Sequence, residues 1–242
     1  MPHNVEDVLI LAGGFGTRLG KLTEKCPKPL LEVNGLPFIF YIIKSVVEKN
    51  KNIKRIYISV GFLSELFIDI KNVFEINFKK IKFLFIEENQ PLGTGGAVKL
   101  GLSRIKKPTI VLNGDTFFPF NFQSFNFEKS SSPVIAVKRE KKVNCSRYGA
   151  ISIVDGRVID FGNNSKSSLI FFNAGTYFFP DYQIFIDMPD SFSLEEFFQV
   201  YVKKNEILGI EINAPFIDIG VPEDFKKAKS FLEEINLNME IN

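Results

Sequence analysis

The chain has one histidine, no tryptophan and two cysteines among its 242 residues. The histidine, His3, lies in a terminus that we expect to be frayed, which excludes Ser-His-Asp and Cys-His catalysis and histidine-based zinc sites. Cys26 and Cys145 are too few for a disulfide framework, so a reducing cytoplasm is the expected location. Any catalysis must therefore use carboxylates, lysine, arginine and a hard metal ion.

Long apolar runs and an excess of one charge are also absent. The longest apolar stretch, residues 38–47, is interrupted by Lys44 and fits a buried amphipathic helix, so no membrane insertion is expected. A net charge of +2 gives no reason to expect nucleic acid as a partner. The 27 phenylalanines fall mainly in apolar segments, which predicts that they fill a core.

Strands and helices alternate in the first half of the chain, up to about residue 132. Apolar runs predict strands at residues 8–11, 55–60, 81–86 and 109–112. Helical patterns lie between them, at residues 37–49, 64–75 and 95–105. This order predicts an α/β fold with a doubly wound, mostly parallel, Rossmann-like sheet and helices on both faces.

The second half, residues 133–242, has a different pattern. Closely spaced strands are predicted at residues 134–138, 150–154, 158–161 and 169–179. Helices are predicted at residues 193–204 and 222–234, and residues 163–168 read as a flexible loop. Because the chain has no internal repeat and no linker, we expect a single domain over residues 1–242, with a small antiparallel lobe in its second half.

A glycine-rich segment follows the first predicted strand and reads Leu11-Ala12-Gly13-Gly14-Phe15-Gly16-Thr17-Arg18-Leu19. Glycines allow backbone N–H groups to approach phosphate oxygens, because no Cβ stands in the way. Arg18 can bind phosphate oxygens bidentately, and Lys28, between two prolines, adds a compact positive charge. Residues 11–19, which we call the phosphate loop, therefore predict a polyphosphate site.

Two other glycine-rich loops fit less well. A dinucleotide-binding loop would have glycine in place of Leu19 and an acidic residue after the next strand, where Gly61 stands. A Walker loop would have Gly-Lys-Ser or Gly-Lys-Thr at a fixed distance, and none is present. The string G-x-G-T-R-L followed by P-K-P is more specific than a glycine pattern alone.

Seven blocks in order along the chain are similar to those of the sugar-1-phosphate nucleotidylyltransferases. They read LAGGFGTRL, PKPL, PLGTGGA (91–97), VLNGDTFF (111–118), RYG (147–149), NAGTY (173–177) and FIDIGVPEDF (216–225). Within this superfamily the chain most resembles the D-glycero-D-manno-heptose 1-phosphate guanylyltransferases. The resemblance implies that a sugar 1-phosphate attacks a nucleoside triphosphate directly and that pyrophosphate is released.

Two carboxylates are candidates for holding Mg²⁺. Asp115 follows the strand at 109–112, and since ligands collect beyond the carboxyl ends of such strands, it is expected beside the phosphate loop. The resemblance adds Asp218, and two carboxylates with phosphate oxygens suit Mg²⁺. It also assigns Arg18 to the leaving pyrophosphate and Lys28 to the α-phosphate. Taken outside their blocks, both aspartates also read as ordinary turn residues.

The resemblance assigns nucleotide binding to residues in two segments: Leu11, Ala12, Gly13, Gly14, Gly16, Thr17, Glu88, Pro91, Gly93 and Thr94. A carboxylate at Glu88 could accept hydrogen bonds from guanine N1–H and N2–H together, which favours GTP. It could equally accept from the single N3–H of uracil, and a solvated strand end is the plain alternative.

Sugar recognition is expected in the second half. Gly149 and Asn173 match family positions whose amides meet sugar hydroxyls, although Asn173-Ala174-Gly175 also reads as an ordinary turn and Tyr148, next to Gly149, reads as core. Relatives commonly have Glu-Lys-Pro soon after the strand matching residues 158–161, and this chain does not. Lys166 is the nearest cation after that strand, so we predict that it binds the sugar phosphate; a solvent-facing lysine is the equal alternative.

The expected reaction is transfer of a nucleotidyl group from GTP to D-glycero-α-D-manno-heptose 1-phosphate, for surface polysaccharide synthesis. Mannose 1-phosphate, or UTP, CTP or dTTP, are alternatives of the same class. A catalytically silent, sugar-nucleotide-binding regulatory subunit is the non-enzyme alternative, and retention of Arg18, Lys28, Asp115 and Asp218 argues against it. A molybdenum-cofactor nucleotidyltransferase, which shares the opening LAGG, is less consistent with Thr17-Arg18-Leu19. Association into a homo-oligomer stays open.

Overall fold

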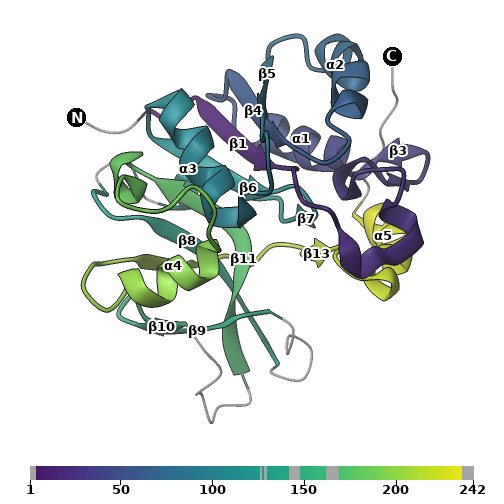
Figure 1. Ribbon diagram of the computed structural model, residues 1–242. Helices are drawn as coiled ribbons and strands as arrows, with labels where there is room; N and C mark the ends of the chain where they lie inside the picture. The colour runs from purple at the N-terminus through teal and green to yellow at the C-terminus, as the bar shows by residue number, and fades with distance from the viewer. Residues whose placement is uncertain (1–3, 126, 128–129, 142–147, 162–168, 236–242) are drawn as a thin grey trace.

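The structure is a computed structural model that describes residues 4–125, 127, 130–141, 148–161 and 169–235. Within these residues the backbone forms one nine-stranded mixed sheet and two smaller two-stranded sheets, with helices packed on both faces of the large sheet (Figure 1). The predicted α/β fold is therefore confirmed.

Four parallel strands of the first half form one side of the large sheet. In spatial order they are β5 (Lys82–Glu87), β4 (Arg55–Val60), β1 (Asp7–Leu11) and β6 (Thr109–Asn113). Val8 and Ile10 on β1 belong to one buried cluster and Leu9 to another, so this strand is covered on both faces. Burial on both faces explains why the strand sequences are continuous apolar runs.

The helices divide between the two faces of the sheet. One buried cluster contains residues of α1 (Phe38–Lys49), α2 (Glu65–Asn77) and α5 (Pro222–Glu234). The other contains residues of α3 (Gly93–Ile105) and α4 (Leu194–Tyr201). Figure 1 shows the two groups on opposite sides of the parallel strands. Each helix predicted from the sequence is present, with ends that differ by up to three residues from the prediction.

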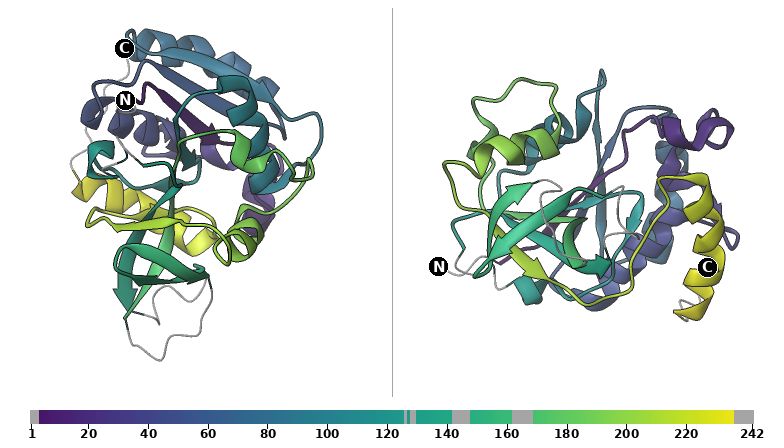
Figure 2. Two further views of the ribbon diagram at one scale, coloured as in Figure 1. Left: turned by 90° about the vertical axis from the view of Figure 1, so that its left-hand side faces the viewer. Right: turned by 90° about the horizontal axis from the view of Figure 1, so that it is seen from below.

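The second half of the sheet begins with β11 (Leu169–Phe179), which pairs antiparallel with β6. The strands beyond it are, in order, β8 (Val134–Lys141), β12 (Leu208–Glu211), β10 (Arg157–Phe161) and β9 (Ala150–Val154). Because β9 also pairs with β11, this part of the sheet closes on itself. Figure 2 shows that these strands extend beyond the helices at one end of the molecule.

Among the residues that the structure describes, parallel pairing is confined to the four first-half strands and to the pair β8 and β12. The other pairings of the large sheet are antiparallel, so the sheet is mixed. Five short strands had no counterpart in the prediction: β2 (Glu32–Val33), β3 (Leu36–Pro37), β7 (Thr116–Phe117), β12 and β13 (Ile217–Asp218). They are two to four residues long, too short to show a period in the sequence. The predicted flexible loop at 163–168 lies outside the described residues.

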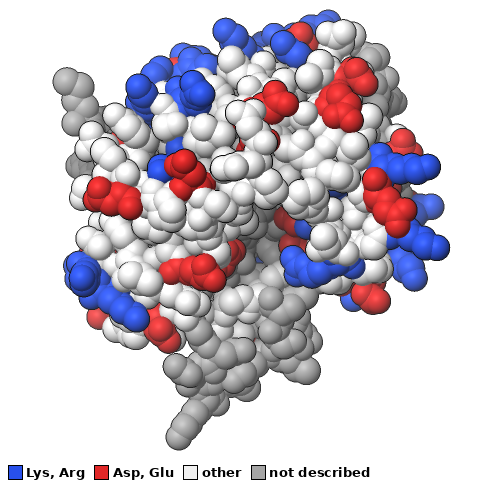
Figure 3. Space-filling model, in the orientation of Figure 1, with Lys and Arg blue, Asp and Glu red and all other residues white. Residues whose placement is uncertain are grey.

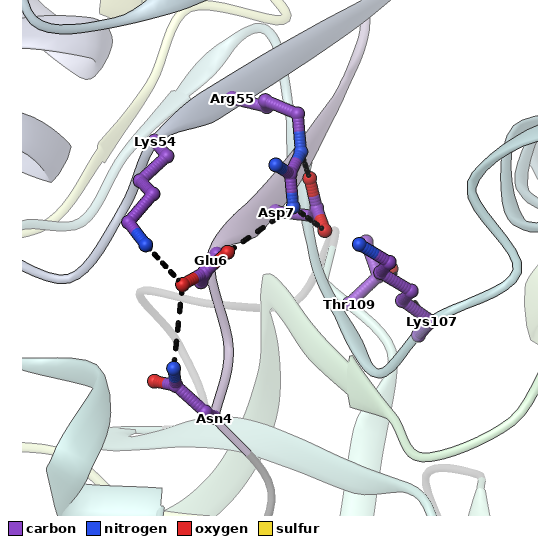
Figure 4. Close-up of polar contacts among 7 residues, drawn as sticks. All are labelled: Asn4, Glu6, Asp7, Lys54, Arg55, Lys107 and Thr109. Carbon is purple, nitrogen blue, oxygen red and sulfur yellow. Dashed lines mark hydrogen bonds and ion pairs between the residues drawn. The ribbon is translucent and has the colours of Figure 1, made fainter.

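Charged residues are paired at the amino ends of β1 and β4 (Figure 4). The Arg55 guanidinium donates to both oxygens of Asp7, which is 1% exposed, and Nη2 also reaches Glu6 at 3.4 Å. Lys54 pairs with Glu6, and this hydrogen bond lowers the pKa of the Glu6 carboxyl. The contact with Asp7 raises the pKa of Arg55 above its ordinary value. This end of the sheet is held together by its own side chains.

Neither sign of charge gathers into an extended patch over the described residues on the face drawn in Figure 3. Among the described residues, none of the helices combines the length and the apolar character required to cross a bilayer.

Candidate active site

A cavity of about 570 Å³ lies at the carboxyl ends of the parallel strands and is lined from both halves of the chain. Its size is within the range of small-molecule sites. Fourteen of the predicted site residues line it: Leu11, Ala12, Gly13, Gly14, Arg18, Lys28, Glu88, Pro91, Gly93, Thr94, Asp115, Gly149, Asn173 and Asp218. The structure therefore brings together most of the residues that the sequence indicated, from segments up to about two hundred positions apart.

Three predicted residues are not among those lining the cavity. Gly16 has a φ of +64°, and a Cβ there would lie 2.9 Å from Thr23 Cγ2, so only glycine fits this left-handed position. Thr17 begins the 3-10 helix Thr17–Thr23, which overlaps the end of the phosphate loop. Both residues belong to the phosphate loop but do not line the cavity. Lys166 lies outside the described residues.

The phosphate loop is fixed at its start and exposed at its middle. The Ala12 N–H donates to Ser59 O at 2.8 Å, which extends the pairing of β1 with β4 by one residue. At Gly13 a Cβ would come within 2.3 Å of Glu88 Oε1, so a side chain here would displace that carboxylate. Gly14 and Arg18 are exposed and face the cavity. The loop thus offers backbone N–H groups and a guanidinium to an anionic ligand.

An acidic centre lies next to the phosphate loop. Asp115 follows β6, and β7 then pairs antiparallel with β13, which places Thr116 opposite Asp218. Lys28 Nζ contacts Asp115 Oδ2 at 2.5 Å. The Thr116 hydroxyl lies 3.2 Å from Asp115 Oδ1 and 3.3 Å from Asp218 Oδ2. The carboxylates of two distant segments therefore lie within reach of one hydroxyl.

This acidic centre fits Mg²⁺ by its donor set. Within the described part of the chain no three His, Cys, Asp or Glu residues group as metal ligands. Mg²⁺ prefers carboxylate oxygens and keeps several waters, and it is commonly held by one or two carboxylates together with substrate phosphates. Asp115 and Asp218, beside a loop suited to phosphate, supply what such an ion requires.

Glu88 lies at the other side of the phosphate loop, just beyond β5. Its Oε1 accepts a hydrogen bond from Ser59 Oγ at 2.9 Å, and its carboxyl also interacts with the Leu92 backbone. Burial raises the pKa of the Glu88 carboxyl, and the two hydrogen bonds oppose that shift. Glu88 is therefore a fixed carboxylate facing a cavity, which argues against a freely solvated strand end.

Residues of the second half close the cavity on its far side. Thr94 Oγ1 accepts from the Leu194 N–H at 2.9 Å and donates to Glu195 Oε2 at 3.2 Å, which joins α3 to α4. Asn173 lies where β11 changes register, with its Nδ2 donating to Tyr177 Oη at 2.8 Å and its Oδ1 accepting from the Gly175 N–H at 3.0 Å. Such irregularities re-aim side chains beside active sites.

The sequence did not single out several residues that line the cavity: Asn113, Thr116, Tyr148, Glu195, Gln199 and Phe216. Tyr148 was predicted to be core, and it is half-buried, stacked on Phe172 with ring centroids 4.9 Å apart. Glu195 and Gln199 are four residues apart on α4 and so share one face, a signal that could have paired them. A helix face exposed to solvent would show the same spacing of polar residues, so the spacing alone does not indicate a site.

Comparison with known proteins agrees with this geometry. The family model for nucleotidyl transferases matches residues 7–235. The chain is 36% identical over 222 residues to the D-glycero-alpha-D-manno-heptose 1-phosphate guanylyltransferase of Campylobacter jejuni, covering 90% of this chain and 96% of the relative. It is 30% identical to the mannose-1-phosphate guanyltransferase of Debaryomyces hansenii, over 90% of this chain and 62% of that protein.

A solved structure is similar over nearly the whole chain. The crystal structure of HddC from Yersinia pseudotuberculosis complexed with GMP-PN has a TM-score of 0.77 and 32% identity, covering 93% of this chain and 99% of that one. A phosphate loop, an acidic centre and a cavity at the carboxyl ends of parallel strands are together typical of α/β enzymes that bind nucleotides. The chain belongs to the nucleotidyl transferase family.

Proposed function

We propose that the chain transfers the guanylyl group of GTP to D-glycero-α-D-manno-heptose 1-phosphate, giving the GDP-heptose and pyrophosphate for lipopolysaccharide or capsule synthesis. The observation that carries the proposal is the single cavity that joins the phosphate loop, the Lys28–Asp115 pair and Glu88. The names of the Campylobacter relative and of the GMP-PN complex support the same sugar and base.

The chemistry proposed is one in-line displacement. An oxygen of the sugar phosphate forms a bond to the α-phosphorus while the bond from that phosphorus to the bridging oxygen of pyrophosphate breaks. Since the phosphate monoester is already ionised near neutral pH, no general base is required. Arg18 neutralises the departing pyrophosphate and Lys28 the α-phosphate, so catalysis depends on positioning and on charge.

Asp115 and Asp218 would hold Mg²⁺ in this scheme. When bound, the ion supplies positive charge to the phosphate oxygens. Lys28 Nζ, which contacts Asp115 at 2.5 Å, lies at the boundary between this acidic centre and the phosphate loop. A lysine ammonium is a compact charge with rotatable donors, so it can turn from the carboxylate towards an arriving phosphate.

The base is assigned to Glu88, with Pro91, Gly93 and Thr94 lining the same part of the cavity. An ionised carboxylate accepts from both N1–H and N2–H of guanine, whereas uracil offers one N–H donor. On the sugar side, Gly149 and Asn173 line the cavity. Lys166 remains the predicted ligand of the sugar phosphate. Lys166→Ala should raise the KM for the sugar phosphate much more than the KM for GTP, and unchanged kinetics for both substrates would reject this role.

A matrix of nucleoside triphosphates against heptose and hexose 1-phosphates, read by pyrophosphate release with Mg²⁺, tests the proposal. GTP with the heptose 1-phosphate should give the highest kcat/KM. Mannose 1-phosphate is the second candidate sugar substrate, because the Debaryomyces relative is named a mannose-1-phosphate guanyltransferase. Turnover with only UTP, CTP or dTTP would reject the guanine assignment. No pyrophosphate from any pair would favour the silent regulatory subunit.

A further inference from the structure

Thr116 occupies an unusual place between the two carboxylates of the acidic centre. Its side chain is buried, with 7% of the residue exposed. It is adjacent to Asp115 in the chain, and the pairing of β7 with β13 brings Asp218 opposite it from 102 positions away. Its hydroxyl is within 3.3 Å of an oxygen of each carboxylate.

Each carboxylate has its other oxygen engaged elsewhere. Lys28 Nζ contacts Asp115 Oδ2 at 2.5 Å, and the Gly220 N–H donates to Asp218 Oδ1 at 2.8 Å. The two remaining oxygens, Asp115 Oδ1 and Asp218 Oδ2, are the ones that face the Thr116 hydroxyl. The orientation of both carboxylates about their bonds is therefore set by contacts on both sides.

The chemistry of the hydroxyl fits this arrangement. An ionised carboxylate only accepts hydrogen bonds, whereas a hydroxyl has one proton and can donate it to either of two acceptors. Thr116 lines a small pocket together with Ile42, Val46 and Leu112, which are buried and apolar, so the shape of valine would also fit at position 116. A buried hydroxyl is costly unless it is hydrogen-bonded, and here both acceptors are acidic site residues.

We propose that Thr116 is a positioning residue, whose hydroxyl holds Asp115 and Asp218 at the spacing at which they share one divalent cation. This inference rests on the proposed metal role of the two aspartates. It concerns the side chain that orients the two carboxylates. Groups that orient metal ligands typically change metal affinity by about 10- to 100-fold when they are removed.

The test compares Thr116→Val, which keeps the shape and removes the hydroxyl, with Thr116→Ser, which keeps the hydroxyl and removes the methyl group. Binding of Mn²⁺ to the whole chain, with and without GTP, is measured by electron paramagnetic resonance, and the Mg²⁺ concentration for half-maximal turnover is measured in parallel. Thr116→Val should raise both the Mn²⁺ dissociation constant and the Mg²⁺ concentration for half-maximal turnover by about 10-fold or more. Thr116→Ser should raise them by less than about threefold. Thr109→Val is the matched control, since it removes a buried hydroxyl that donates to Lys107 O at the far end of β6.

A purely structural role predicts the opposite order. Thr116→Ser, which leaves a void, would then lower the melting temperature more than Thr116→Val, and Mn²⁺ affinity would stay at the wild-type value in both. That result overturns the inference. If Thr116→Val does not fold, Thr116→Ala compared with Thr116→Ser decides the same question.

Asp115→Asn and Asp218→Asn separate this inference from the proposed function. If both lose Mn²⁺ while Thr116→Val binds it normally, the metal site stands and the role of Thr116 is rejected. If the wild type and both aspartate variants bind Mn²⁺ alike, the metal assignment itself is wrong, and the inference falls with it.

Discussion

The parallel strands have a carboxylate paired with a cation at each end, and the two pairs differ in what surrounds them. At the amino end, the Asp7 side chain is 2% exposed and the Arg55 guanidinium occupies both of its oxygens. At the carboxyl end, Asp115 is 17% exposed, meets a single lysine nitrogen and lines a cavity. A planar guanidinium gives a fixed, saturated pair, whereas an ammonium leaves room for another ligand. We therefore expect the first pair to serve stability and the second to serve binding.

The largest expected effect comes from breaking the pair at the carboxyl end. Lys28→Ala and Asp115→Ala should each lower turnover by about 100- to 1,000-fold, because each removes charge stabilisation where charge is redistributed during transfer. Steady-state pyrophosphate release and thermal melts measure the two consequences. The melting temperature should change little, and a loss of only a few-fold in turnover would mean that the site is misassigned.

Breaking the pair at the amino end should give the reverse result. Asp7→Asn leaves the Arg55 guanidinium without its buried partner, and it should cost about 3 kcal/mol of stability. For a chain of this length that corresponds to a fall in melting temperature of roughly 6–12 °C. Turnover per folded molecule should match the wild type at a temperature where the variant is folded. A loss of turnover larger than the loss of folded protein would show that the two ends are not independent.

A third carboxylate, Glu88, extends the comparison of the two pairs. It has no cationic partner among its described contacts and is held by the Ser59 hydroxyl and the Leu92 backbone. Glu88→Gln keeps the shape and removes the charge, so it should lower kcat/KM for GTP by about 10- to 100-fold through the loss of charge-assisted hydrogen bonds. The KM for the sugar phosphate should stay nearly constant. Equal effects on both substrates would remove Glu88 from base recognition.

The smallest effect is expected from pH. Burial raises the pKa of Glu88, so the carboxylate that guanine requires is lost as the pH falls, beginning above the ordinary carboxylate range. The same shift means that the folded protein binds this proton more tightly than the unfolded chain, so Glu88 stabilises the fold at low pH and this contribution is lost as the pH rises through its folded pKa.

Ser59→Ala tests the cause of that pH dependence. The hydrogen bond from Ser59 lowers the pKa of Glu88, so its removal should move the acid limb of kcat/KM for GTP to higher pH. At neutral pH the effect should be less than about tenfold. Glu88→Gln is the control and should abolish this limb. An acid limb that persists in Glu88→Gln would belong to another group.

The elements that could be predicted from the sequence are those with local signals. Strand β4 was predicted at the residues where it lies, because a strand buried on both faces is a continuous apolar run. The phosphate loop and Asp115 follow from glycine chemistry and from the rule for carboxyl ends of strands. The pairing of β7 with β13 could not be predicted, since two residues show no period and the partner is about a hundred positions away. The place of Thr116 depends on that pairing.

Side-chain direction was equally hard to predict. Asn173 lines the cavity as expected, but its carboxamide is held by Tyr177 and Gly175 within its own strand. A sequence motif shows which residues are neighbours in the chain, but it does not show which way their side chains point. Here the direction of the Asn173 side chain depends on the register shift in β11, which is a tertiary effect.

Strand β11 has a consequence for how the molecule unfolds. Its last residues, 176–179, pair with β6, residues 169–173 and 177–178 pair with β8, and residues 171–172 pair with β9. One continuous strand therefore belongs to the sheet of both halves of the chain, and neither half has a complete sheet without it. Thermal unfolding should accordingly be a single cooperative transition, and separate fragments cut between residues 132 and 133 should not fold independently. The cavity, which is lined from both halves, therefore depends on a framework that is gained or lost as one unit.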